Sequence, residues 1–262
     1  MKGRRMLGAI TGDIVGSIYE GHNHKSKDFP FFGQGCTFTD DTVCTIAVAD
    51  CLMNDGDFAD FLRRYVRKHP YRGYGGMFRE WAGSNMGPYN SWGNGSAMRV
   101  SPVAHVARDE QELLDLAEQT SVVTHNHPDA VAGAQATALT MWMAKFGIDV
   151  AAIREEISNR FDYNLSPSVD DIRPSYRFDI SCAGTVPQTT TCALEGTDYE
   201  DAVRNAISIG GDADTIACIT GGIAEVMFGL PDEIAEASLG YLTDDLIEVV
   251  DRFQSTKEEA FP

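Results

Sequence analysis

The sequence has no long apolar run and no excess of basic residues. No apolar stretch approaches the ~20 residues that span a bilayer. Lys and Arg number 21 against 39 Asp and Glu, which gives a formal net charge of −18. A surface of that sign repels nucleic acid and anionic membranes. We therefore expect no membrane partner and no direct binding to a nucleic-acid duplex, and an anionic ligand would need a local reversal of charge, which metal cations usually provide.

Cysteine pairing patterns are absent as well. The six cysteines form no C-x-x-C pair, and Cys44, Cys51, Cys192 and Cys218 lie in apolar stretches of helical character. Buried free thiols in a cytoplasmic protein are the simplest interpretation. The basic N-terminus leads into a short apolar stretch, but Asp13 interrupts it and no small-residue cleavage site follows. That pattern does not predict a signal peptide.

Strand patterning is missing too, since no sustained alternation of apolar and polar residues is followed by a hairpin turn. Helical periodicity is frequent instead, and 43% of the 262 residues are hydrophobic, enough for one sizeable core. The pattern predicts a single, mostly α-helical domain over 1–262. Helices are expected over Phe58–Val66 after a capping Asp57, Leu113–Thr120, 128–146 from Pro128, 193–194, 202–209 and Leu242–Phe253, and long functional loops over 21–37, 70–95 and 160–190.

Two distant segments carry nearly the same polar cluster at the start of an apolar stretch. Thr39-Asp40-Asp41-Thr42 runs into VCTIAVADCL, and Asp212-Ala213-Asp214-Thr215 runs into IACITGGIAEVMFG. Helix capping is the simpler interpretation, because Asp and Thr are favoured N-cap residues. One such side chain satisfies a cap, however, and adjacent acids leading into buried helices repel each other unless a cation lies between them. Oxygen-only clusters suit Mg²⁺, Mn²⁺ or Ca²⁺ rather than zinc, so we favour a metal site and keep capping as the alternative.

Three weaker motifs accompany these clusters. In Gly12–Glu20, two glycines flank Asp13, and Glu20 follows seven residues later, about two helical turns away; taken alone, this predicts a glycine-interrupted helix with two solvated acids. Gly93–Arg99, GNGSAMR, is a turn that can direct backbone N–H groups at a phosphate, although it lacks a Walker lysine and equally fits an ordinary loop. Thr124–Pro128, THNHP, fits a capped helix start that leaves one histidine free for a ligand.

Taken in order, GDxxGxxxE, TDDT, GNGSAMR, TH and GGDADT resemble the motifs of the ADP-ribosylglycohydrolase family, over a stretch from Gly8 to about Gly229. The resemblance implies an all-α fold, a compact orthogonal helical bundle with long functional loops. It also implies a binuclear metal cleft that holds two divalent cations, Mg²⁺ or Mn²⁺. The metal ligands that match the family motifs are Thr39, Asp40, Asp41, Asp212, Asp214 and Thr215.

The same resemblance implies a site for the organic ligand. Residues that match the loop holding the diphosphate and ribose are Gly93, Asn94, Gly95, Ser96, Met98 and Arg99. His125 matches a substrate-side histidine, and Glu20 matches a mobile acid near the metals. Tyr89 or Trp92 is close enough in sequence to stack on adenine.

The implied chemistry is hydrolysis of the glycosidic bond between ADP-ribose and an acceptor. Glu20 and the four aspartates of the two clusters carry five negative charges, and two divalent cations bring four positive ones, so a diphosphate is not repelled. Metals would grip the ribose hydroxyls and orient a water, and Glu20 or Asp41 would move the proton. A two-metal phosphoester hydrolase and a non-catalytic ADP-ribose-binding module are the alternatives. Glu20 favours the hydrolase, because a pure binder has no need of an acid beside the metals.

Overall fold

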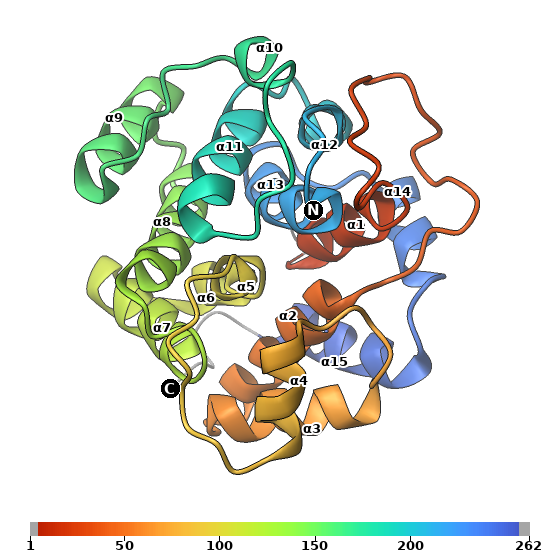
Figure 1. Ribbon diagram of the computed structural model, residues 1–262, viewed down its shortest axis with the longest axis vertical. Coiled ribbons are helices and arrows are strands. Elements are labelled where there is room, and N and C mark those ends of the chain that lie inside the picture. The colour runs from red at the N-terminus through yellow and green to blue at the C-terminus, as the bar shows by residue number, and fades with distance from the viewer. Residues whose placement is uncertain (1–4, 257–262) are drawn as a thin grey trace.

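Two buried helices, α1 (Leu7–Gly16) and α13 (Ala213–Phe228), lie side by side near the centre of the computed structural model, which describes residues 5–256 (Figure 1). Their backbones approach each other along a stripe of glycines on α1. A Cβ added at Gly12 would lie only 1.9 Å from the Ala217 carbonyl oxygen. The close contacts pair Gly8 with Gly221, Gly12 with Ala217 and Gly16 with Ala213. This order makes the two helices antiparallel, and the end of α1 therefore meets the beginning of α13.

The remaining described elements are also helices, which confirms the all-α prediction. They are α2 (Asp40–Met53), α3 (Phe58–Lys68), α4 (Gly76–Gly83), α5 (Gly95–Met98), α6 (Ser101–Val106), α7 (Glu110–Val122), α8 (Pro128–Lys145), α9 (Val150–Phe161), α10 (Val169–Ile172), α11 (Cys182–Leu194), α12 (Tyr199–Ser208), α14 (Asp232–Leu239) and α15 (Asp244–Ser255). Between residues 5 and 256 the β-structure amounts to one isolated antiparallel bridge that joins Gly93 to Ser181. Residues 1–4 and 257–262 of the predicted single domain lie outside the described residues. Across the part that the structure describes, no helix combines the length and the apolar character that a bilayer-spanning segment needs.

The helices predicted from periodicity are present, and their ends follow the capping rules. Asp57 caps α3 by accepting a hydrogen bond from the backbone N–H of Asp60 at 2.9 Å. Pro128 is the first residue of α8, as predicted. The six cysteines are free and buried, which is what the apolar context of four of them indicated.

Two of the three predicted loops contain helices. Segment 70–95 includes α4, which buries Phe78 and Trp81 but is too short for a clear period. Segment 160–190 includes α10, a single turn held by a capping box, and the first half of α11. Helix α11 could not be predicted over its full length because Pro187 lies inside it, and proline normally ends a helix. The short helix expected at 193–194 is therefore the last turn of α11.

The polar clusters converge because of this packing. The turn after α1 carries Glu20, the N-terminus of α2 carries Asp40 and Asp41, and the N-terminus of α13 carries Asp214. All four side chains line one cavity of about 530 Å³. Residues that are almost 200 positions apart in the sequence thus share one cleft.

Candidate active site

Nearly all the residues singled out in the sequence line this cleft. They are Glu20, Thr39, Asp40, Asp41, Gly93, Asn94, Gly95, Met98, Arg99, His125, Asp212, Asp214 and Thr215. Ser96 is the exception, because its fully buried hydroxyl donates to the Ala130 carbonyl at 2.8 Å and so secures α5 to α8. Tyr89 and Trp92 also line the cleft, and Trp92 is about half exposed there.

Asp13 organises the first cluster, a role that its sequence pattern did not indicate. The pattern suggested a solvated acid in an interrupted helix, but α1 is continuous and Asp13 is fully buried. One carboxylate oxygen accepts the Thr39 hydroxyl at 2.6 Å. The other accepts the backbone N–H of Thr39 at 2.9 Å, the backbone N–H of Thr42 at 3.1 Å and the Thr42 hydroxyl. Asp13 therefore fixes the start of α2. Because the Thr39 hydroxyl donates to Asp13 and caps α2 by accepting the Asp41 backbone N–H at 3.3 Å, one of its oxygen lone pairs stays available.

The second cluster does more than cap its helix. Asp212 occupies the N-cap position of α13 but makes no side-chain cap hydrogen bond. Its carboxylate instead accepts from the Asn94 amide at 2.7 Å, which joins the glycine-rich turn to the acidic cluster. Gly210 and Gly211 precede it in the left-handed region, with φ values of 71° and 85°, where glycine is the residue of lowest strain. The Thr215 hydroxyl donates to Asp41 at 3.4 Å and so links the two clusters.

The acids of this cleft are crowded, and most of them are buried. Burial, reinforced by Asp13, raises the pKa of Asp40 to about 8. Burial is also the main reason that the pKa values of Asp41 and Asp214 are far above those of ordinary carboxyl groups, and neighbouring aspartates add to the rise. The pKa of Glu20 is raised by burial and then by Asp212 and Asp13. A cleft of this kind attracts cations strongly, because each added positive charge relieves several repulsions at once.

The donor set fits hard divalent cations. Two groups of carboxylates each place one oxygen per residue within 4.8 Å of the others: Asp13 with Asp41 and Asp214, and Glu20 with Asp212 and Asp214. Asp214 belongs to both groups. Asp41 Oδ1 is buried without a hydrogen-bond partner in the part of the chain that is described, although a buried carboxylate oxygen normally has one. Oxygen ligands arranged around a shared carboxylate suit Mg²⁺ or Mn²⁺.

We expect the metal-free protein to lose stability as the pH rises from about 4 to about 8. The folded-state pKa values of these acids are raised, so the folded protein holds protons that the unfolded chain has already released. Stability is then complete below the unfolded pKa and is lost as the pH rises through the folded one, by up to about 1.4 kcal/mol per pH unit for each acid. Urea unfolding in chelator measures this slope, and saturating Mg²⁺ should flatten it. A chelated protein whose stability rises over this range would contradict the crowding of uncompensated acids.

The rest of the cleft lining is built from the glycine-rich turn, His125 and aromatic side chains. The sequence missed several of its residues, including Met77, Phe178 and Ile180, which are exposed apolar side chains at the cleft. They lie in segments that carry no local motif. The nearest sequence signal was the glycine-rich character of 73–76, which lines the same cleft.

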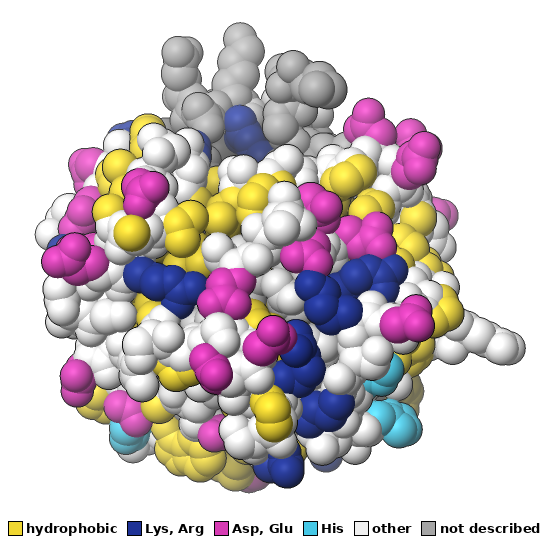
Figure 2. Space-filling model, turned by 90° about the horizontal axis from the view of Figure 1, so that it is seen from above, with side chains coloured by type: hydrophobic (Ala, Val, Ile, Leu, Met, Phe, Trp, Pro, Cys, Tyr) yellow, Lys and Arg dark blue, Asp and Glu magenta, His cyan; other side chains and the backbone are white. Residues whose placement is uncertain are grey.

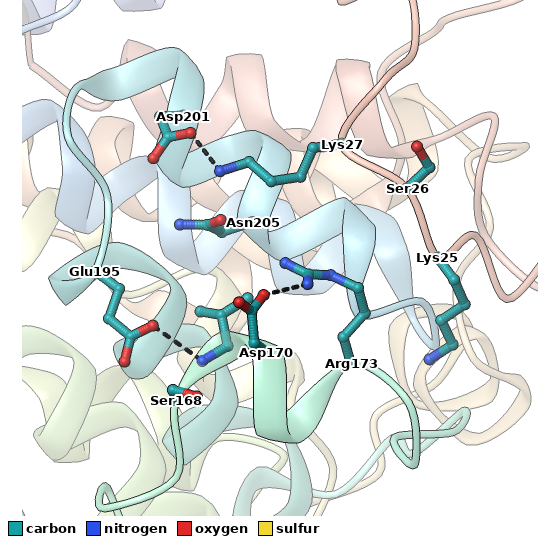
Figure 3. A pocket seen from close by; sticks show the side chains of 10 residues that line it. Lys25, Ser26, Lys27, Ser168, Asp170, Arg173, Glu195, Asp201 and Asn205 are labelled. Atoms are coloured by element: carbon teal, nitrogen blue, oxygen red, sulfur yellow. Dashed lines mark hydrogen bonds and ion pairs between the residues drawn. The ribbon is translucent and has the colours of Figure 1, made fainter.

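A second cavity, of about 540 Å³, contains basic residues but is braced by its own contacts (Figure 3). Lys27 pairs with Asp201 and Arg173 pairs with Asp170, while Lys25 donates to the Tyr176 carbonyl at 2.9 Å. Figure 2 shows Lys and Arg side chains gathered near the middle of one face, with acidic side chains beside them. The basic side chains of this cavity are thus bound by other groups of the protein, which favours a structural role over ligand binding.

The chain thus combines an all-α fold with a carboxylate-rich cleft that is lined by a glycine-rich turn. Comparison with known proteins identifies the family that shares these features. The family described as ADP-ribosylglycohydrolase matches residues 5–260, and the chain belongs to this family. It is 26% identical to the ADP-ribosylarginine hydrolase Tri1 of Pseudomonas putida over 86% of this chain and 70% of that protein. It is 24% identical to the ADP-ribosylhydrolase ARH3 of Homo sapiens over 92% of this chain and 90% of that one.

Among solved structures, one titled "ADP-ribosylglycohydrolase-related protein complex" aligns with a TM-score of 0.70 and 22% identity, over 99% of this chain and 98% of the other. At that identity the match bears on the fold alone. The family and its relatives support ADP-ribosyl hydrolase activity as the general function.

Proposed function

We propose that the protein is a metal-dependent hydrolase that cleaves the glycosidic bond between ADP-ribose and an acceptor and releases ADP-ribose. The observation that carries the proposal is that the acidic cluster and the glycine-rich turn lie side by side in one cleft. Buried acids with raised pKa values stand beside a glycine-rich turn, and the hydrogen bond from Asn94 to Asp212 connects the two. Acids alone fit many metal enzymes, whereas a phosphate-binding turn tied directly to them fits a ligand that carries both phosphate and a reacting sugar.

The residues of the chain divide into two roles in this proposal. Two divalent cations, Mg²⁺ or Mn²⁺, would be held by Thr39, Asp40, Asp41, Asp212, Asp214 and Thr215, and when bound they supply Lewis acidity and orient a water. The backbone N–H groups of Gly93 and Asn94 already donate to Ser91 Oγ and to the Ile180 carbonyl, so the Gly95 backbone and His125 contact the diphosphate in this proposal. Trp92 is the better candidate to stack on adenine, because its ring is half exposed at the cleft whereas Tyr89 packs toward His125, with ring centroids 6.1 Å apart.

Glu20 favours hydrolysis over binding alone. It is exposed at the cleft, its carboxylate lies within 4.8 Å of those of Asp212 and Asp214, and its pKa is raised toward the range useful for proton transfer. Asp41 is the alternative for the proton-transferring role. One of its oxygens has no hydrogen-bond partner among the described residues, but its burial makes exchange with solvent slower.

Release of ADP-ribose from a panel of modified substrates tests the proposal. The panel contains arginine- and serine-linked ADP-ribosyl peptides, an ADP-ribosylated oligonucleotide and a generic aryl phosphate, each assayed with chelator, Mg²⁺ and Mn²⁺. We expect release of ADP-ribose from at least one linked substrate and its loss in chelator. Turnover of the aryl phosphate alone would favour a phosphoester hydrolase, and tight ADP-ribose binding without release from any substrate would favour a binding module.

A further inference from the structure

Arg99 is a buried cation in the cleft wall, and it has no acidic partner among residues 5–256. Its side chain is fully buried where it borders the cleft, and its Nε and Nη1 have no hydrogen-bond partner among the described residues. One of its terminal nitrogens, Nη2, donates to the Thr120 carbonyl at 2.7 Å and to the Thr124 hydroxyl at 2.9 Å. Because a guanidinium remains charged at all relevant pH values, these contacts are permanent features of the cleft.

The Thr124 hydroxyl connects Arg99 to His125 by hydrogen bonds. Thr124 is fully buried, and its oxygen lies 2.7 Å from His125 Nδ1. Arg99 can only donate, so the Thr124 oxygen accepts from Arg99 and its own hydrogen points to Nδ1. If Nδ1 carried a hydrogen instead, both neighbours would donate to Thr124, and its buried hydroxyl hydrogen would have no acceptor among its described partners.

An accepting Nδ1 places the imidazole hydrogen on Nε2. Burial and the charge of Arg99 lower the pKa of His125 well below the ordinary value, so the ring stays neutral. Nε2 faces the glycine-rich turn, because a Cβ added at Gly95 would lie 3.0 Å from it and one at Gly93 would lie 3.5 Å away. The ring is therefore a fixed donor on the wall of the cleft that carries the turn.

We propose that Arg99 and Thr124 are positioning residues, which hold His125 in a single neutral tautomer whose Nε2–H is directed into the cleft as a donor to an oxygen of ADP-ribose. The identity of the ligand rests on the proposed function; the tautomer does not. In this arrangement Arg99 acts through Thr124 and His125 rather than by gripping the diphosphate. His125 binds and orients, and it does not transfer protons.

Nitrogen NMR of the histidine-labelled protein without ligand tests the tautomer directly. We expect His125, assigned from the His125→Gln variant, to show an unprotonated Nδ1 and a protonated Nε2 that persist from about pH 5.5 to about pH 8. Thr124→Ser should keep this signature, whereas Thr124→Val should lose the single tautomer. Thr120→Val is the matched control, because it removes a buried hydroxyl one turn away that donates only to the Ala117 carbonyl. Titration of His125 near pH 6.5, or an unchanged tautomer in Thr124→Val, would overturn the proposal.

Calorimetric titration with ADP-ribose provides the second readout. Thr124→Val should weaken binding by about 2- to 13-fold, the range for one hydrogen bond, while Thr124→Ser and Thr120→Val bind normally. Affinity that is unchanged in Thr124→Val would overturn the proposed contact. A fixed tautomer in a protein that binds no ADP-ribose would contradict the proposed function and still support the positioning of His125.

A glycine substitution reaches the same ring without touching Thr124. Gly95→Ala places a methyl group 3.0 Å from His125 Nε2 and should displace the imidazole while leaving the protein folded; a shift of the His125 nitrogen signals reports this displacement separately from any loss of ADP-ribose affinity caused at Gly95 itself. Gly83→Ala is the control, because a Cβ there meets nothing within 4 Å. Equal affinity of the two alanine variants would show that the Nε2 face of the ring does not contact the ligand.

Discussion

Asp214→Asn is expected to stabilise the metal-free protein and at the same time to abolish its response to metal. Asp214 is buried, and its pKa is raised by burial and then by the charges of Asp41 and Asp212. An amide of the same shape removes one of the repelling charges and still accepts the Thr215 backbone N–H, which lies 2.9 Å from Oδ1. Metal binding, in contrast, loses the one carboxylate that both ligand groups share.

Thermal unfolding in chelator, Mg²⁺ and Mn²⁺ measures both parts of this expectation. Ligand at 100 times its Kd stabilises a native protein by about 2.7 kcal/mol, and the variant should lack that gain. Mutation of a residue that hydrogen-bonds to a metal ligand typically costs about 10- to 100-fold in activity. Because Asp214 is itself a proposed ligand, the rate of ADP-ribose release should fall by more than this. Asp41→Asn should behave in the same way.

Asp50→Asn separates this behaviour from ordinary loss of a carboxylate. Asp50 is also buried, but it accepts from Tyr65 at 2.8 Å and pairs with Arg64 at 3.0 Å, outside the cleft. Its replacement should lower stability equally with and without metal. If Asp214→Asn instead loses stability in chelator and is still stabilised by metal, Asp214 only stabilises the first turn of α13 and the metal assignment fails.

The two acidic clusters could be predicted because each depends only on residues that are adjacent in the sequence. Each places several acids next to the start of an apolar helix, and repulsion between neighbours can be inferred without knowing the fold. Asp13 is different, because its partners Thr39 and Thr42 lie 26 and 29 residues away. Its glycine neighbours suggested an interrupted helix, but those glycines are the surface on which α13 packs, and only the packed pair reveals this.

Arg99 shows the same limit in the ligand-binding wall. The resemblance of GNGSAMR to the family motif implies that Gly93–Arg99 form the loop that holds the diphosphate and ribose, with Arg99 among the ligand-binding residues. In the structure the turn does line the cleft, but the arginine side chain is buried and donates to the end of α7 and to Thr124. The motif identified a segment that lines the cleft, whereas the direction of the Arg99 side chain depends on its contacts with α7, which the motif does not contain.

Glu20→Gln is expected to leave the fold and most of the ADP-ribose affinity intact while turnover falls by about 10²- to 10⁴-fold, the range for a lost general acid or base. Glu20 follows α1 in an exposed turn, so the amide perturbs no core contact. The substitution therefore changes the chemistry of one carboxylate that lies beside Asp212 and Asp214.

Single-turnover release of ADP-ribose, run beside calorimetry with ADP-ribose and with Mg²⁺, distinguishes the roles open to Glu20. A proton-transferring acid gives slow turnover with normal metal affinity. A permanent metal ligand gives metal affinity and rate that fall together, which would place Glu20 with Asp214 rather than with the catalytic groups. Glu118→Gln, an exposed acid on α7 outside the cleft, is the control and should be silent. Normal turnover in Glu20→Gln would remove Glu20 from the mechanism and leave Asp41 as the carboxylate that moves the proton.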